Sequence, residues 1–387
     1  MIEHALSRRD ALRVGALAVG ATLSGTVRAA SATSPNVVET RVISRQPQLY
    51  HGWPTLTRQK SGRLVLVWSG RREAHVCPFG TVEMMTSDDE GANWSWPRTL
   101  LDSALDDRDA GILETQAGTL LVTTFTSLAY EPTLERAERE QKWDAERLAR
   151  WQSARDRLSA EQRQQELGTW MLRSTDNGLT WSARYDSLVN SPHGPTQLAD
   201  GRILYAGKQL WRETPRIGVS VSEDDGQSWK WLAEIPTRSG DDPKNYHELH
   251  AVETASGRII AQIRNHNKQT HYETLQAVSD DGGATWSVPE TTGIWGYPSH
   301  LLRLRDDRIV MSYGHRRAPI GNQARVSSDD GRSWSEPIRI SADAASGDLG
   351  YPSTVELTDG TLLTVWYEKM ADAPLAVLRQ ARWQLDA

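Results

Sequence analysis

The chain of 387 residues has a single cysteine, Cys77, so no disulfide can form within it. Its stability must therefore come from packing and strand pairing. Positive charge is not in surplus, because 44 Lys and Arg stand against 50 Asp and Glu. A mildly acidic chain without a basic stripe is not expected to bind nucleic acid through bulk charge. Phenylalanine occurs only twice, whereas tryptophan occurs 16 times, partly because it belongs to a repeated motif.

No hydrophobic run is suited to spanning a bilayer, because the apolar stretch that starts at residues 14–19 is short and rich in Gly and Ala. It follows residues 7–12 (SRRDAL), which resemble a twin-arginine export signal with Ala11 in place of the usual Phe. Small residues suited to cleavage follow at 29–32. We therefore predict a signal peptide over residues 1–32, no stable membrane span, and a periplasmic or secreted protein. An uncleaved anchor is the alternative.

The pattern Ser-x-Asp-x-Gly-x-x-Trp recurs along the chain. Its five copies are residues 87–94, 174–181, 222–229, 279–286 and 327–334. Ser and Asp side chains cap turn amides, Gly supplies a positive φ, and Trp packs back over the loop. The motif is therefore interpreted as a structural hairpin turn rather than as a set of carboxylate sites for metal or catalysis.

A second repeat, strand–turn–strand, lies between these motifs. Its six turns are at residues 61–62, 117–118, 200–201, 256–257, 306–307 and 359–360, and a β-rich run follows each of them. The turns recur about every 50 residues apart from one longer interval, which is typical of propeller blades. We predict an all-β fold, a six-bladed β-propeller over residues 37–387. Residues 37–43 are expected to close the ring in the sixth blade, which lacks the Asp-containing motif.

The one long interval contains residues 131–167, which are rich in Glu, Arg, Gln and Ala and lack β character. Charge pairs four residues apart predict a helix, and so a helical insertion in blade two. The insertion is either a surface decoration or a lid, since it leaves from a loop on the face described next.

Both kinds of turn lie on one face of a propeller, so the remaining loops gather on the other face. Nine of the ten histidines fall in or beside those loops, together with arginines and aromatic residues. The candidate site residues from this face are His51, Trp53, Arg72, Glu73, His75, Arg108, Asp109, His193, Glu248, His250, Arg264, Tyr297, Arg316 and Tyr351.

With these motifs the chain resembles the sialidase (neuraminidase) superfamily, the Asp-box or BNR-repeat propellers. Residues 248–257 (ELHAVETASG) resemble the family's Glu-x-x-Val-Val-Glu-Leu-x-Asp-Gly stretch, and residues 350–353 (GYPS) resemble the segment that carries its Tyr nucleophile. The resemblance implies that Tyr351 is the nucleophile and that Glu248 takes its proton. Arg264, with Arg316 or Arg317, would then bind a substrate carboxylate.

Two positions depart from the family pattern. Gly52-Trp53-Pro54 replaces the family's Arg-Ile-Pro, so the first arginine of its carboxylate-binding triad is missing. No Asp lies between Arg72 and Glu83 to match the family's acid/base, so Glu73 or His75 would have to serve. These departures argue against strict specificity for sialic acid and favour a different sugar, such as a uronic acid or a neutral residue.

The resulting expectation is an exo-glycosidase that removes terminal sugars from glycans, without a cofactor. A lyase acting on uronate polysaccharides is one alternative, with a Tyr or His as the base. A propeller that binds glycans without catalysis is another. A metal site is the weakest alternative, because the spacing of His247, Glu248, His250 and His266 matches no defined metal motif.

Overall fold

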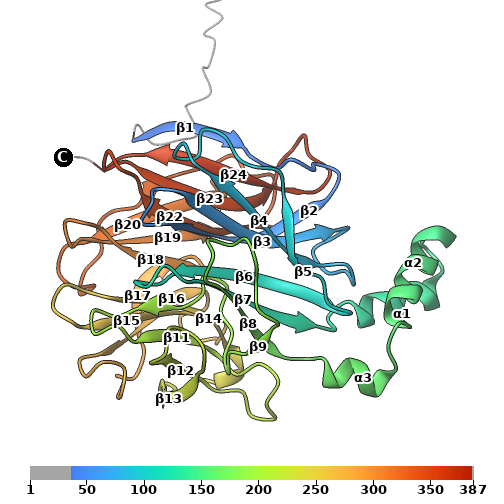
Figure 1. The fold of residues 1–387 in the computed structure, drawn as a ribbon, viewed down its shortest axis with the longest axis horizontal. Coiled ribbons are helices and arrows are strands. Elements are labelled where there is room, and N and C mark those ends of the chain that lie inside the picture. The colour runs from blue at the N-terminus through green and yellow to red at the C-terminus, as the bar shows by residue number, and fades with distance from the viewer. Residues whose placement is uncertain (1–35, 386–387) are drawn as a thin grey trace, which may run out of the picture. The chain divides into compact units, whose positions relative to one another are not determined.

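The computed structural model describes residues 36–385, which form six four-stranded antiparallel sheets arranged as the blades of a β-propeller (Figure 1). This confirms the predicted all-β, six-bladed fold. Blade one contains β2 (Tyr50–Arg58), β3 (Leu64–Arg72), β4 (Thr81–Ser87) and β5 (Arg98–Leu101). Blade two contains β6 (Asp106–Glu114), β7 (Leu120–Ser127), β8 (Thr169–Ser174) and β9 (Tyr185–Asp186). Blade three contains β10 (Thr196–Gln197), β11 (Ile203–Lys208), β12 (Ile217–Ser222) and β13 (Lys230–Glu234). Blade four contains β14 (Tyr246–Glu253), β15 (Ile259–Asn265), β16 (Glu273–Ser279) and β17 (Glu290–Trp295). Blade five contains β18 (Ser299–Arg303), β19 (Ile309–His315), β20 (Gly321–Ser327) and β21 (Ile338–Arg339). Blade six contains β22 (Leu349–Glu356), β23 (Leu362–Lys369), β24 (Ala376–Trp383) and β1 (Val37–Val42).

The first strand of the chain closes the ring. Strand β1 pairs antiparallel with β24, with Val37 opposite Trp383. The outermost strand of the sixth blade therefore precedes the first blade in the sequence, whereas its other three strands follow the fifth blade. The indole of Trp94, from the turn motif of blade one, donates to Gln380 Oε1 at 2.8 Å and joins the first blade to the last. The predicted pairing of residues 37–43 in the sixth blade is therefore confirmed.

Neighbouring blades are also joined near the axis by hydrogen bonds between their inner segments. Leu56 N donates to Ser353 Oγ at 3.0 Å between blades one and six, and Leu249 N donates to Ser191 Oγ at 2.7 Å. Because the second strand of each blade is packed between two neighbours, strands such as β3 and β11 are buried nearly throughout. These contacts fix the inner strands that carry the site.

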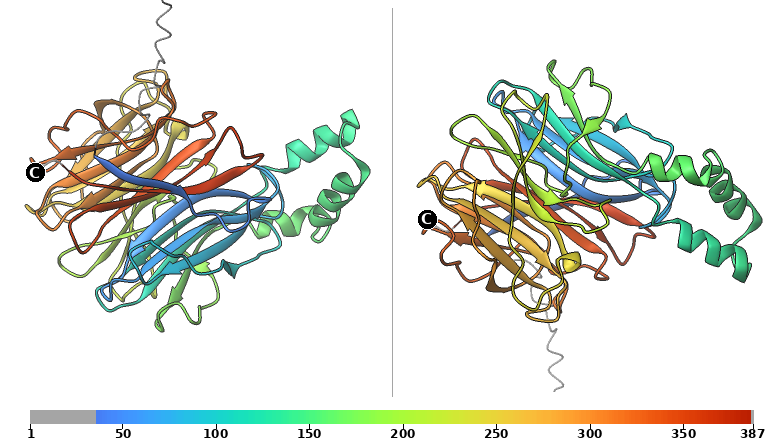
Figure 2. Two further views of the ribbon diagram at one scale, coloured as in Figure 1. Left: turned by 90° about the horizontal axis from the view of Figure 1, so that it is seen from above. Right: turned by 90° about the horizontal axis from the view of Figure 1, so that it is seen from below.

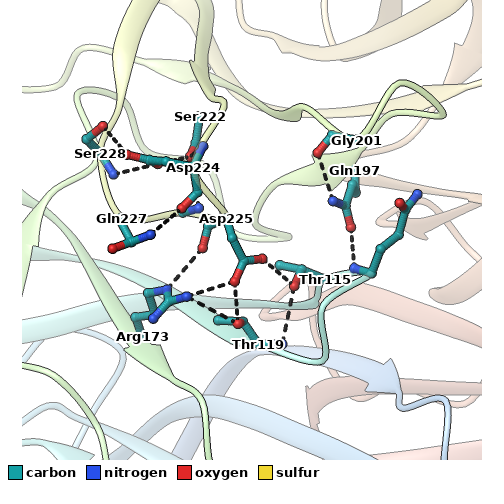
Figure 3. A network of polar contacts seen from close by, with 12 residues as sticks. Thr115, Thr119, Arg173, Gln197, Gly201, Ser222, Asp224, Asp225, Gln227 and Ser228 are labelled. Carbon is teal, nitrogen blue, oxygen red and sulfur yellow. Dashed lines mark hydrogen bonds and ion pairs between the residues drawn. The ribbon is translucent and has the colours of Figure 1, made fainter.

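The Asp-containing motifs form the expected turns. In blade three, Ser222 Oγ donates to Asp224 Oδ1 at 2.8 Å and accepts from Gly226 N at 2.8 Å, and the same Asp224 oxygen accepts from Ser228 N at 2.9 Å. Figure 3 shows how the neighbouring Asp225 accepts hydrogen bonds from Arg173, Thr115 and Thr119 of blade two. The turn is thus a structural unit that also links adjacent blades.

Three helices lie between β7 and β8 of blade two and extend to one side of the blades (Figure 2). They are α1 (Glu131–Glu140), α2 (Ala145–Arg155) and α3 (Ala160–Gln165). Asp144 caps α2 by accepting from Arg147 N, and Ser159 and Gln162 form a capping box on α3. A small core of Cys77, Tyr130, Leu134 and Trp151 joins α1 and α2 to the blade-one loop. A 3₁₀ turn, η1 (Pro243–Asn245), precedes β14.

The predicted signal peptide, residues 1–32, lies outside the described residues. Within residues 36–385, no helix is long and apolar enough to cross a membrane.

The turn glycines give a test of the packing between blades. Gly226 has φ +81°, and a Cβ placed there would lie 2.6 Å from Leu121 of blade two. We expect Gly226→Ala to lower the free energy of unfolding by about 1–2 kcal/mol for the left-handed backbone and by about 1–3 kcal/mol more for the clash. Gly201, with φ +91° and open space around its Cβ position, is the matched control. Denaturant unfolding should show Gly226→Ala as the more destabilised variant, and equal losses would contradict this packing.

Candidate active site

The inner strands of four blades are irregular near one end, and these irregularities present the central side chains. Pairing registers shift between Gly52 and Thr55 in β2, between Arg108 and Gly111 in β6, between His247 and Leu249 in β14, and between Gly350 and Ser353 in β22. The side chains carried by these bulges are Trp53, Asp109, Glu248 and Tyr351. A bulge re-aims a side chain out of the regular alternation of a strand, which is how blades one, two, four and six present side chains at one end of their inner strands.

Three of these residues have left-handed backbone. The φ angles of Trp53, Asp109 and Tyr351 are 54°, 52° and 52°. A non-glycine residue in this region costs about 1–2 kcal/mol, and such strain concentrates at functional sites. The shared geometry in blades one, two and six therefore marks this end of the inner strands as the candidate site.

Tyr351, Glu248 and Arg264 are in direct contact at the centre. The Tyr351 hydroxyl donates to Glu248 Oε1 at 2.6 Å. Nη1 of Arg264 donates to both Glu248 oxygens, at 2.9 and 2.6 Å, and to the Tyr351 hydroxyl at 3.1 Å. The three residues come from β22, β14 and β15, so two blades build the group. The structure thus brings together the three residues to which the family resemblance assigned the roles of nucleophile, base and carboxylate-binding arginine.

The charges of this group determine its protonation. Burial raises the pKa of Glu248, but the Arg264 guanidinium and the Tyr351 hydroxyl outweigh burial and hold that pKa at about 2. Burial is the main cause that holds the pKa of Tyr351 well above its ordinary value, and the negative charge of Glu248 raises this pKa further. At neutral pH the site therefore contains a neutral phenol that donates to an ionised carboxylate.

A cationic region adjoins the central group. The guanidinium carbon of Arg264 lies 4.4 Å from the ring centroid of Tyr297, and that of Arg316 lies 4.8 Å from the same ring. Arg316 Nη2 donates to the carbonyl of Leu349, whereas Nη2 of Arg264 makes no hydrogen bond to another described residue. Two guanidinium groups held on one aromatic ring suit an anionic group of a ligand.

Trp53 occupies the side of the site contributed by blade one. The guanidinium carbons of Arg108 and Arg72 lie 4.3 and 4.9 Å from its ring, and the Tyr351 ring centroid lies 6.4 Å away. His75 packs edge-on against the same indole at 5.0 Å. The residue that replaces the family arginine is therefore part of the site and contacts two other arginines.

Three histidines from blades three, four and five pack together beside Tyr351. His250 and His300 stack at 4.7 Å, and His193 lies 5.5 and 5.1 Å from them and 6.4 Å from the Tyr351 ring. Burial depresses the pKa of all three, so they are neutral at neutral pH. Neither ring nitrogen of His193 has a hydrogen-bond partner among the described residues.

The arrangement offers no metal site within the described part of the chain. No group of three or more His, Cys, Asp or Glu residues there could hold a metal ion. The metal alternative based on His247, Glu248, His250 and His266 therefore finds no support in residues 36–385, and Glu248 is instead engaged by Arg264 and Tyr351.

Residues 146–364, more than half of the chain, match the family model of the BNR repeat-like domain. The chain belongs to this family. No curated protein sequence matches it significantly.

Solved structures share the architecture of this BNR-repeat propeller. A Dyadobacter fermentans protein of unknown function has a TM-score of 0.74 at 22% identity, covering 91% of this chain and 100% of that one. The NanB sialidase of Streptococcus pneumoniae has a TM-score of 0.60 at 14% identity, covering 90% and 70%. The intramolecular trans-sialidase of Ruminococcus gnavus has a TM-score of 0.61 at 14% identity, covering 91% and 99%. The resemblance to the sialidase superfamily is thus confirmed for the fold.

Other residues predicted for the site of this BNR-repeat protein have different surroundings. Arg72 is 0% exposed, and its guanidinium pairs with both oxygens of Asp106 at 2.5 and 2.9 Å. The Glu73 carboxylate accepts from Arg150 at 2.9 Å and from the Trp151 indole at 3.0 Å, both on α2. His51 is buried near Ser44. Arg72 thus supports Trp53 from within the fold, and Glu73 attaches the helices to blade one.

Sequence reasoning missed a polar cluster next to the site. Asp348 Oδ1 accepts from Tyr50 at 2.9 Å and from Tyr367 at 3.2 Å, and lies 2.9 Å from His75 Nδ1. Burial raises the pKa of Asp348, but the interactions with His75 and the hydrogen bonds from Tyr50 and Tyr367 together outweigh burial and lower that pKa. The available signal was the position of Asp348 three residues before Tyr351.

The contacts of Glu73 give a test of the attachment of α2. In Glu73→Ala, the Trp151 indole loses its acceptor, and an unsatisfied buried donor costs about 1–3 kcal/mol. We expect faster amide hydrogen exchange in residues 145–155. Glu146→Ala removes an exposed partner of the same Arg150 and serves as the matched control, with exchange close to that of the wild type. Equal exchange in all three proteins would mean that Glu73 does not anchor the helix.

Proposed function

We propose that this protein is an exo-acting glycosidase with a sialidase-like mechanism, in which Tyr351 is the nucleophile and Glu248 its base. The observation that carries the proposal is the 2.6 Å hydrogen bond from the Tyr351 hydroxyl to Glu248, with Arg264 in contact with both groups. A phenol is a poor nucleophile unless an adjacent base accepts its proton. A Tyr nucleophile is also a known departure from the two-carboxylate scheme of glycosidases.

In the proposed first step, the Tyr351 oxygen bonds to the anomeric carbon while its proton passes to Glu248. The glycosidic bond breaks, and the leaving oxygen receives a proton from an acid. Water then attacks the tyrosyl-linked sugar, and Glu248 returns its proton to Tyr351. Arg264 stabilises the group throughout, because its guanidinium contacts both oxygens that exchange the proton.

The charges around the central group support an acidic terminal sugar as the substrate. Arg264 and Arg316 lie on the Tyr297 ring, and Arg108 lies on Trp53. The missing first arginine of the family pattern, replaced by Trp53, leaves both sialic acid and a uronic acid as substrates to test. The predicted export signal would place the enzyme outside the cytoplasm, in contact with external glycans.

The first test is hydrolysis of 4-methylumbelliferyl sialoside and 4-methylumbelliferyl glucuronide by the purified protein. We expect Tyr351→Phe to remove turnover of the substrate that the wild type accepts, because the attacking oxygen is gone. Tyr313→Phe is the matched control, since this buried hydroxyl contacts Gln323 and Arg325 and should leave activity unchanged. Ligand binding without turnover in the wild type would identify a non-catalytic glycan-binding propeller instead.

A covalent trap tests the role of Tyr351 directly. A fluorinated analogue of the accepted sugar with a good leaving group should react with the enzyme and slow its own release. Peptide mass spectrometry is then expected to show the sugar on Tyr351, whereas Glu248→Gln should form the adduct about 10²–10⁴-fold more slowly because the base is lost. An adduct on another residue would exclude this mechanism.

A uronate-polysaccharide lyase is the second candidate, and His193 is the observation that favours it. A neutral imidazole with two unpartnered nitrogens next to a tyrosine could remove the proton beside a uronate carboxylate. Lyase products carry a conjugated double bond, so ultraviolet absorbance that grows during digestion of uronate polysaccharides would establish this reaction in place of hydrolysis.

A further inference from the structure

The proposed hydrolysis needs a group that protonates the leaving oxygen, and the two blade-one residues expected in that role, Glu73 and His75, have other partners. The Glu73 carboxylate is bound by Arg150 and Trp151, and Nδ1 of His75 lies within hydrogen-bond distance of Asp348 and Tyr50. In a retaining mechanism this group must first donate a proton and then accept one from water.

Asp109 has the surroundings that such a group requires. Asp109 is only 7% exposed. Its Oδ1 atom is buried and has no hydrogen-bond partner among the described residues. A buried carboxyl oxygen without a partner costs free energy unless a ligand or a proton satisfies it. By contrast, the nearby buried carboxyl group of Asp107 is bonded to Ser103 N and Oγ at 2.8 and 2.9 Å.

The backbone holds Asp109 in this position. The residue lies in the register shift of β6 with φ 52°, as Tyr351 lies in that of β22 with the same φ. A Cβ on Gly111, two residues further along, would lie 2.4 Å from the backbone nitrogen of Gly194 in the next blade. The bulge is therefore packed directly against blade three, which holds the backbone that carries Asp109 in place.

From these observations, and on the basis of the function proposed above, we propose that Asp109 is the general acid and base of the reaction. Its carboxylic acid donates a proton to the glycosidic oxygen as the bond from that oxygen to the anomeric carbon breaks and the Tyr351 bond forms. The resulting carboxylate then takes a proton from water, whose oxygen displaces Tyr351 from the sugar. Both groups return to their initial states, and the sum is one glycosidic bond hydrolysed by one water.

The electrostatic surroundings agree with this role. Burial raises the pKa of Asp109 to about 7, and Glu248 of β14 raises it as well, whereas Arg108 of β6, Arg72 of β3 and Arg264 of β15 lower it. Tyr351 of β22 and Tyr205 of β11 also interact electrostatically with Asp109. Glu248, with its pKa of about 2, remains ionised. Two carboxyl groups whose surroundings separate their pKa values in this way divide the roles of acid and base between them.

The pH profile follows from this pair of pKa values. Glu248 must be ionised and the acid must be protonated, so kcat/KM should be constant between the pKa of Glu248, about 2, and that of Asp109, and should fall as pH rises through about 7. In Asp109→Asn this alkaline decrease should disappear, because the acid whose protonation controls the rate is gone, whereas Asp107→Asn should retain the decrease.

The experiment compares two substrates of the same acidic sugar, a 4-methylumbelliferyl glycoside and a glycoside with an alkyl leaving group such as a disaccharide. Asp109→Asn should lower kcat/KM for the alkyl glycoside by about 10²–10⁴-fold and much less for the aryl glycoside, whose phenolate leaves without protonation. In Asp109→Ala, azide should restore turnover of the aryl glycoside and give a glycosyl azide. Asp107→Asn, a buried neighbour outside the site, should retain activity on both substrates.

The outcomes separate this inference from the proposed function. A wild type that hydrolyses both substrates through Tyr351, together with an Asp109→Asn variant that loses neither activity nor the alkaline decrease, would overturn the role of Asp109 alone. Equal losses on both substrates without azide rescue would reduce Asp109 to a binding or structural residue. A wild type that hydrolyses no glycoside in the panel would overturn the proposed function and this role together.

Discussion

The closure of the ring is the constraint on which the site depends. Pairing of β1 with β24 completes the sixth blade, and that blade packs its inner strand β22 against β2 of the first. One hydrophobic cluster contains Tyr50, Trp53 and Leu56 from blade one together with Tyr351 and Tyr367 from blade six. Since Trp53 and Tyr351 belong to this cluster, the same packing that joins the ends of the propeller also places two of its central side chains.

Burial of charge is the second organising feature. Arg264 is paired with Glu248, and Arg72 with Asp106, in both cases at hydrogen-bond distance and with little exposure. A buried pair is costly unless its geometry is good and further hydrogen bonds complete it. Here the Tyr351 hydroxyl completes the hydrogen bonding of the Arg264–Glu248 pair. The buried pair in turn polarises this hydroxyl. Asp109 differs because its Oδ1 atom has no hydrogen-bond partner within residues 36–385, and burial raises its pKa.

Local motifs were predictable because their interactions lie within a few residues. The hydrogen bonds among Ser222, Asp224, Gly226 and Ser228 are contained in one eight-residue motif, and the other four copies of the motif form the same Ser–Gly hydrogen bond. The pairing of Tyr351 with Glu248 followed from a family resemblance and is present in the structure at 2.6 Å. The surroundings of Glu73 and Arg72 were not predictable, because their partners on α2 and β6 are set by packing between segments distant in sequence.

The sequence by itself determined the repeat, the number of blades and the strand that closes them, because strand periodicity and turn chemistry are local properties of the chain. It also placed the histidines, arginines and tyrosines on one face. Apart from the pairing of Tyr351 with Glu248, which the family resemblance implied, only the tertiary structure decided which of these side chains meet. The register shifts that aim Trp53, Asp109, Glu248 and Tyr351 at one point arise where an inner strand meets its neighbours, and no local pattern encodes that contact.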